Sequence, residues 1–266
     1  MFVFKAAVVG AGTMGAEIAH AIAGANIPVV VKDAEPSRVE SGLERARALW
    51  QRRVDAGKMQ SSELDRSMAL ITGATDYEAF GDVDLVIEAV PEEIETKRTV
   101  FAELDQATPG HAIFASNAST LSITEMGEAT SRPDKVVGLH FFYPASRARV
   151  VEVIEGADTS PETTQAASNF AQAIRKMPIR ALDSPGFVVG RIISSVASEL
   201  WRCEEDSGID VHELETIIAA SKATQASPIF GADLLGPETL SRLTAHLREC
   251  YGDRFYVGKG LHEDRS

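Results

Sequence analysis

The chain has 266 residues, of which 44% are hydrophobic and 24% charged, and its formal net charge is −13. This length allows two domains, and the composition excludes a disordered chain, a collagen-like repeat and a disulfide-rich scaffold. The acidic balance argues against nucleic acid as a partner. Cys203 and Cys250 are too few for a disulfide framework or a structural zinc site, so we expect two buried thiols in a reducing compartment. Without a membrane-length apolar run or a leader, the sequence predicts a cytoplasmic protein and no membrane partner.

The first part of the chain alternates strands with one helix. An apolar strand at 6–9 precedes the glycine-rich turn 10–15, a helix at 16–25 follows, and a second strand at 28–33 ends in Asp33. This order predicts a right-handed βαβ unit with a parallel sheet.

The glycine turn has the spacing G-x-G-x-x-G, and each glycine has a physical role. Gly10 permits the tight turn, Gly12 lets the backbone approach a pyrophosphate, and Gly15 allows close helix–sheet packing. The helix N-terminus supplies N–H donors for the phosphates. Asp33 would accept hydrogen bonds from the ribose hydroxyls and repel a 2′-phosphate. The segment therefore predicts an NAD site.

The next elements continue a doubly wound pattern and then become helical. We expect a helical hairpin at 37–56 and 61–70 and further strands at 83–90, 112–117, 135–142, 149–156 and 179–182. We also expect helices at 93–106 and 163–176 and a helix that begins after Ser122. Beyond residue 185 the apolar spacing of Val189, Ile192, Ile193, Val196 and Leu200 predicts a buried or amphipathic helix, and two more helices begin near 210 and 237. The predicted fold is an α/β, Rossmann-type doubly wound sheet with an inserted helical hairpin (1–184), followed by a smaller, shortened all-helical domain (185–266).

Three residues near the carboxyl ends of predicted strands have side chains suited to catalysis: Ser119, His140 and Glu152. Glu152 lies within an apolar strand, where a carboxylate must find a donor or stay protonated. The preceding strand, reversed at Pro144, could bring His140 within reach, and such a pair fixes the imidazole tautomer for a general base. Alternatively, these could be a turn serine, a core histidine and an edge acid facing water. The other histidines show no metal-ligand spacing, and we expect no metal.

Several segments together resemble the L-3-hydroxyacyl-CoA dehydrogenase family, most closely the dehydrogenase portion of bacterial multifunctional fatty-acid oxidation proteins. They are VGAGTMG at 9–15, IEAV at 87–90, SNAS at 116–119, HFF at 140–142, VEVI at 151–154 and DSPGF at 183–187. The order and spacing hold over roughly residues 5–190.

The resemblance implies roles for individual residues. His140 matches the catalytic base, Glu152 the acid that pairs with it, and Ser119 the serine that contacts the substrate oxygen. Cofactor contacts are implied for Gly10, Gly12, Thr13, Met14, Gly15, Asp33, Ala89, Glu92, Lys97 and Asn117. The helical hairpin corresponds to an element that helps hold CoA, and the family dimerises largely through its helical domain, which implies a homodimer.

The sequence also departs from the family pattern. Tyr143 and Gly190 stand where the family has asparagine, Ala226-Ser227-Pro228 replaces a Met-Gly-Pro segment, and the chain ends at Ser266, before the ending that we expect. Loss of a preorganised donor near a developing charge commonly costs on the order of 10²–10³ in rate. We therefore expect Gly190, together with the short C-terminus, to lower turnover without removing NAD binding.

These observations predict NAD-dependent, reversible oxidation of an L-3-hydroxyacyl-CoA to the 3-ketoacyl-CoA, as in fatty-acid β-oxidation. Two alternatives stay open. One is a dehydrogenase of the same fold that acts on a free hydroxy acid. The other is a catalytically impaired paralogue that binds NAD or acyl-CoA without turnover.

Overall fold

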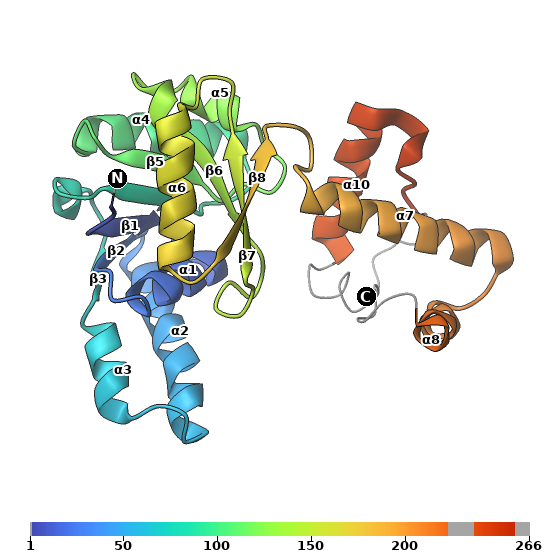
Figure 1. The fold of residues 1–266 in the computed structure, drawn as a ribbon, viewed down its shortest axis with the longest axis horizontal. Coiled ribbons are helices and arrows are strands. Elements are labelled where there is room, and N and C mark those ends of the chain that lie inside the picture. The colour runs from blue at the N-terminus through green and yellow to red at the C-terminus, as the bar shows by residue number, and fades with distance from the viewer. Residues whose placement is uncertain (1, 223–236, 259–266) are drawn as a thin grey trace. The chain divides into compact units, whose positions relative to one another are not determined.

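The computed structural model describes residues 2–222 and 237–258, and the chain divides into two compact units, Met1–Asp183 and Ser184–Ser266 (Figure 1). The first unit is built on one sheet, and among its described residues the second is helical.

The sheet of the first unit has eight strands in the order β3-β2-β1-β4-β5-β6-β7-β8. Neighbouring strands are parallel, except that β6 and β7 are antiparallel. The strands are β1 Ala6–Val9, β2 Val29–Lys32, β3 Ile71–Ala74, β4 Leu85–Glu88, β5 Ile113–Ser116, β6 Val136–Phe141, β7 Val150–Glu155 and β8 Met177–Leu182. The reversal of strand order between β1 and β4 is that of a doubly wound fold, which confirms the predicted fold class.

Three helices of this unit begin at residues that favour a helix start. The hydroxyl of Ser122 accepts the Glu125 N–H at the start of α5, Ser160 caps α6 in the same way, and Pro36 starts α2. The elements are α1 Thr13–Ala23, α2 Pro36–Asp55, α3 Ser61–Met68, η1 Glu78–Phe80, α4 Ile94–Ala107, α5 Ile123–Gly127, η2 Pro133–Lys135 and α6 Pro161–Ala173.

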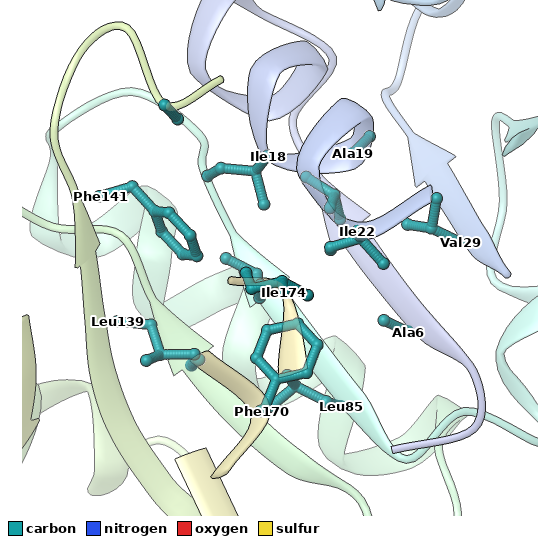
Figure 2. Packing of buried hydrophobic residues seen from close by; sticks show 14 of the residues in the cluster. Ala6, Ile18, Ala19, Ile22, Val29, Leu85, Leu139, Phe141, Phe170 and Ile174 are labelled. Atoms are coloured by element: carbon teal, nitrogen blue, oxygen red, sulfur yellow. The ribbon is translucent and has the colours of Figure 1, made fainter. Parts of the chain in front are cut away.

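One hydrophobic core lies between the sheet and helices α1, α2 and α6 (Figure 2). Alternate strand residues point into it, as the pleat of a strand requires; in β1 these are Ala6 and Val8. Ile18 and Ile22, four residues apart on α1, meet them from the helix side. Full burial of each isoleucine contributes roughly 1.5–3 kcal/mol.

Strand β3 was missed by the sequence analysis, which placed only a helical hairpin between β2 and β4. The strand is short, and exposed residues interrupt its apolar pattern. Its Gly73 lies directly under α2, where a Cβ atom would stand 2.5 Å from Cγ1 of Val39. The glycine that weakens the strand signal is therefore what lets α2 pack on the sheet.

The second unit contains α7 Val189–Ser207, α8 Val211–Ser221, α10 Pro237–Tyr251 and η3 Gly252–Arg254. Its packing corrects one expectation. The buried side of α7 is formed by small residues, Gly190, Ser194, Ala197 and Ser198, rather than by the apolar series that the sequence singled out. Small residues allow close approach of a neighbouring helix, and a Cβ at Gly190 would lie 3.5 Å from Leu243 of α10.

The two cysteines correct another expectation. Cys203 of α7 and Cys250 of α10 are both exposed rather than buried. Among the described residues, no helix combines the length and the apolar character needed to cross a membrane.

His20 of α1 is a buried titratable group in this core. Its ring stacks on Trp50 with centroids 4.3 Å apart, and neither ring nitrogen has a hydrogen-bond partner among the residues described. Burial disfavours the charged imidazolium and lowers the pKa of His20 to about 4, and three cations add to this effect: Arg53, Lys176 and Arg52.

This pKa shift predicts acid sensitivity of the fold. Because the pKa is about 4 in the folded chain and about 6.5 in the unfolded chain, the unfolded state binds an extra proton between these values. The contribution of His20 to stability is complete above pH 6.5 and falls by about 3 kcal/mol as the pH drops to 4. The unfolding free energy of the wild type minus that of His20→Leu should fall by this amount between pH 6.5 and pH 4.

Unfolding can be followed by Trp50 fluorescence in a Trp201→Phe background, since these are the two tryptophans of the chain. The exposed His212 provides the control, and His212→Leu should leave the pH profile of unfolding unchanged. A difference between wild type and His20→Leu that stays constant with pH would refute the prediction.

Candidate active site

The candidate site lies at the carboxyl edge of the sheet, where three central strands end level with one another. Val9 of β1 pairs with Glu88 of β4, and Glu88 pairs with Ser116 of β5. The turns after these strands therefore leave the sheet side by side, at the point where the strand order reverses. Doubly wound folds bind their ligands at such switch points.

The glycine turn after β1 requires glycine at two of its three glycine positions. Gly10 has φ +106°, and a Cβ there would lie 2.5 Å from the carbonyl oxygen of Ala89. At Gly15 a Cβ would come within 1.8 Å of the Gly10 carbonyl oxygen. At Gly12, by contrast, a Cβ would meet nothing within 4 Å, because open space lies over the N-terminus of α1. Thr13 begins that helix.

Asp33 is tied to the glycine turn from the end of β2. Its Oδ2 accepts the N–H of Ala11 at 2.9 Å, and its Oδ1 accepts the N–H of Ala34 at 2.8 Å. Each carboxylate oxygen keeps a second lone pair for a ligand hydroxyl. The structure therefore brings the predicted ribose acceptor to the predicted phosphate turn.

His140 and Glu152 face each other across the antiparallel pair β6–β7. They are register partners, and Nδ1 of His140 lies 2.7 Å from Oε2 of Glu152. Glu152 is fully buried, and β7 is flanked by β6 and β8, which rules out an edge acid facing water. A carboxylate accepts only, so Nδ1 donates the proton and Nε2 is the basic nitrogen of the neutral ring.

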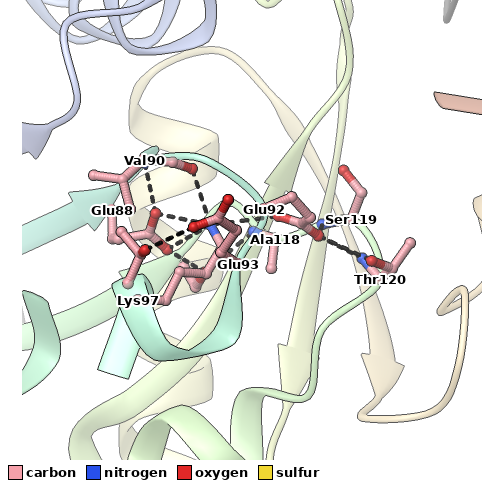
Figure 3. A network of polar contacts seen from close by, with 10 residues as sticks. Glu88, Val90, Glu92, Glu93, Lys97, Ala118, Ser119 and Thr120 are labelled. Atoms are coloured by element: carbon pink, nitrogen blue, oxygen red, sulfur yellow. Dashed lines mark hydrogen bonds and ion pairs between the residues drawn. The ribbon is translucent and has the colours of Figure 1, made fainter. Parts of the chain in front are cut away.

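Ser119 lies in the loop after β5, and Glu92 binds this loop (Figure 3). Oε1 of Glu92 accepts the N–H groups of Ser119 at 2.7 Å and Thr120 at 2.9 Å. Asn117, in the same loop, accepts the N–H of Phe141 through Oδ1 at 2.8 Å. Because Phe141 follows His140, this bond ties the Ser119 loop to the strand of the imidazole. Ser119 is not a helix cap, since Ser122 caps α5.

Lys97 of α4 is buried beside these residues. Its ammonium lies 2.8 Å from Oε1 of Glu88 and 3.4 Å from Oε2 of Glu92. Glu88 was missed in the sequence analysis as a site residue. The signal was available, because Glu88 is a carboxylate at the end of an apolar strand, which is the argument that singled out Glu152.

The remaining predicted residues lie in the first turn of α1, after β6, in the second unit or outside the described part. Met14 is partly buried against the core. Tyr143 is half-exposed, and Gly190 belongs to the second unit. The Ala226-Ser227-Pro228 segment and the end of the chain lie outside the described residues. No group of three metal-ligating side chains occurs in the part of the chain that the structure describes.

Comparison with known proteins identifies the family. Residues 5–184 match the family model described as 3-hydroxyacyl-CoA dehydrogenase, NAD binding domain. The peroxisomal fatty acid beta-oxidation multifunctional protein MFP2 of Arabidopsis thaliana is 38% identical over 205 residues, which are 76% of this chain and 28% of MFP2. This chain thus spans little more than a quarter of that relative.

Several solved structures match nearly the whole chain, FadB2 and PaaH1 among them. The structure of M. tuberculosis FadB2 is 31% identical with a TM-score of 0.94, covering 98% of this chain and 93% of FadB2. The (S)-3-hydroxybutyryl-CoA dehydrogenase PaaH1 of Ralstonia eutropha is 29% identical with a TM-score of 0.92, covering 97% and 92%. These matches confirm the resemblance seen in the sequence: the chain belongs to the 3-hydroxyacyl-CoA dehydrogenase family, and its first unit is the NAD-binding domain of that family.

Proposed function

We propose that the protein is an NAD-dependent dehydrogenase that oxidises an L-3-hydroxyacyl-CoA to the 3-ketoacyl-CoA and catalyses the reverse reduction. The observation that carries the proposal is the 2.7 Å contact between His140 and Glu152 at the carboxyl edge of an NAD-binding sheet. The activity in the name of the PaaH1 relative supports the same substrate class.

The described residues fit NAD. The open space over Gly12 would admit a pyrophosphate against the N–H groups that begin α1, with Thr13 and Met14 in the first turn. Asp33 would hold the ribose hydroxyls. Ala89, Glu92 and Asn117 follow the ends of β4 and β5 and would contact the rest of the cofactor. Lys97, predicted as a further cofactor contact, is 1% exposed and would act through its ion pair with Glu92. When bound, NAD supplies the hydride acceptor.

In the proposed chemistry, Nε2 of His140 takes the proton of the substrate hydroxyl. Glu152 holds the ring through Nδ1 and favours the imidazolium that forms, because a buried carboxylate and a cation attract strongly in a low dielectric. In reduction the same nitrogen returns the proton. Ser119 orients the substrate oxygen.

Two alanine substitutions in the glycine turn should separate cofactor binding from folding. At Gly12 the methyl group meets no protein atom, so Gly12→Ala should fold normally. It would occupy the pyrophosphate space and raise the Kd for NADH by about tenfold or more, measured by NADH fluorescence. At Gly15 the methyl group would clash with the Gly10 carbonyl, so Gly15→Ala should lower the Tm as well. An unchanged NADH affinity in Gly12→Ala would contradict the proposed cofactor site.

The proposed reaction is tested by acetoacetyl-CoA reduction, followed by NADH absorbance. The wild type should turn over this substrate, and His140→Ala should lose activity by about 10² or more, because it removes the group proposed to transfer the proton. Glu152→Gln should lose less, since an amide oxygen still accepts the Nδ1–H. A preference for free hydroxy acids would favour the first alternative. Tight NADH binding with no turnover would favour the catalytically impaired paralogue.

One observation favours this second alternative. Gly190, where the family has a polar asparagine, offers no side chain, and its Cα faces Leu243 within the second unit. If turnover depends on that amide, activity is low while NADH binding is normal. Acetoacetyl-CoA reduction, measured together with NADH binding, distinguishes an active dehydrogenase from the impaired paralogue.

For assembly and location we propose a cytoplasmic homodimer formed through the second unit. Ile192 and Val196, one turn apart on α7, are 59% and 42% exposed, and Ile217 of α8 is exposed as well. Exposed aliphatic residues in a stripe are typical of association surfaces. The MFP2 relative is peroxisomal by name. Fractionation of cells tests whether this protein is found in the cytoplasm instead.

A charge placed on this stripe should break the dimer. Ile192→Glu should convert a dimer into a monomer in size-exclusion chromatography with light scattering, because burying an unpaired carboxylate at an interface is costly. Gln172→Glu, which adds a negative charge at an exposed position of α6 in the first unit, serves as a control and should leave the dimer intact. A wild-type protein that is monomeric at tens of micromolar would refute the proposal.

A further inference from the structure

The buried carboxylate of Glu88 has no part in the proposed chemistry, yet donors surround it. Oε1 accepts the N–H of Val90 at 2.6 Å and the Lys97 ammonium at 2.8 Å. Oε2 accepts the Ser116 hydroxyl at 2.6 Å and the Lys97 ammonium at 3.0 Å. Glu88 is 0% exposed, so it cannot contact a cofactor or a substrate, and any effect on the reaction must pass through these partners.

One path leads from Glu88 through Lys97 to the Ser119 loop. The Lys97 side chain is 1% exposed, and its ammonium lies between the carboxylates of Glu88 and Glu92. Glu92 in turn accepts the backbone N–H groups of Ser119 and Thr120 (Figure 3). If Glu88 lost its charge, the ammonium would keep Glu92 as its single carboxylate partner among the described residues. We expect it to shift toward Glu92 and to pull that carboxylate away from the loop.

A second, shorter path reaches the same loop. The hydroxyl of Ser116 donates to Glu88 and accepts the N–H of Ala118 at 3.1 Å. Ala118 directly precedes Ser119. Two separate chains of ion pairs and hydrogen bonds from one carboxylate therefore end on consecutive residues of one loop, which restricts its position more than either chain alone.

We propose that Glu88 is a positioning residue for the reaction: it fixes the Lys97 ammonium and the Ser119 loop together. The inference rests on the proposed function, because Glu92, which Lys97 holds, receives its cofactor role and Ser119 its substrate role there. It adds that one buried carboxylate aligns the cofactor side and the substrate side of the site. Substitution of a residue needed only for folding would lower stability without changing both the affinity for NADH and kcat.

The test compares Glu88→Gln, which removes the charge at nearly constant volume, with a core variant of the same strand. Ile87 is buried in the hydrophobic core, and Ile87→Val or Ile87→Ala, whichever matches the Tm loss of Glu88→Gln, is the control. We expect Glu88→Gln to raise the Kd for NADH about tenfold and to lower kcat for acetoacetyl-CoA about tenfold or more. The control should change neither by more than about twofold. Equal effects in Glu88→Gln and its control would overturn the proposal.

A second variant covers the case in which Glu88→Gln does not fold. Ser116→Ala interrupts only the shorter path and leaves the ion pair intact. It should lower kcat at least severalfold while the Kd for NADH stays within about twofold; a kcat within twofold of wild type would overturn the proposal. NADH binding needs no turnover. A wild type that binds NADH but does not reduce acetoacetyl-CoA would therefore refute the proposed reaction, while the Kd of Glu88→Gln still decides the link to Lys97.

Discussion

Glu152 has no exposed surface, and a carboxylate in such a place must be matched by a donor or lose its charge. The donor is Nδ1 of His140 on the neighbouring strand. This requirement constrains both partners, because the imidazole can satisfy the carboxylate only in one tautomer and one ring orientation. The antiparallel pairing of β6 and β7, in a sheet that is otherwise parallel, is what puts the two residues opposite each other.

The same physical requirement recurs at Glu88, with a different solution. There the donors are an ammonium, a hydroxyl and a backbone amide rather than an imidazole. Both carboxylates lie on strands of one sheet, but Glu88 is satisfied by groups that hold loops, and Glu152 by a group that can move a proton. In the reaction that we propose, buried charge serves two purposes at this edge: Glu152 keeps the imidazole reactive, and Glu88 fixes the backbone around it.

The fold of the first unit was largely predictable, because its strands and helices follow apolar periodicity and its glycine turn requires glycine. The contact between His140 and Glu152 could also be anticipated from the sequence, because an apolar strand offers its carboxylate few hydrogen-bond partners. Strand β3 was missed because Gly73 and its exposed neighbours hide the pattern. Glu92 and Lys97 were reached only through the family resemblance. Their link to Glu88 depends on the path of the chain between β4 and α4, which periodicity does not describe. The prediction for the buried side of α7 was wrong, because close helix packing selects small residues over large apolar ones.

The central claim is that Glu152 holds the His140 ring with its proton on Nδ1. Nitrogen-15 NMR of protein with labelled histidines, at a pH where the ring is neutral, reports directly which ring nitrogen carries the proton. His140→Gln assigns the signal of His140, and Glu152→Ala tests its dependence on the carboxylate. The account predicts a protonated Nδ1 and an unprotonated Nε2 for His140, with this preference lost in Glu152→Ala. A proton on Nε2 in the wild type, or a tautomer unaffected by removal of the carboxylate, would contradict it.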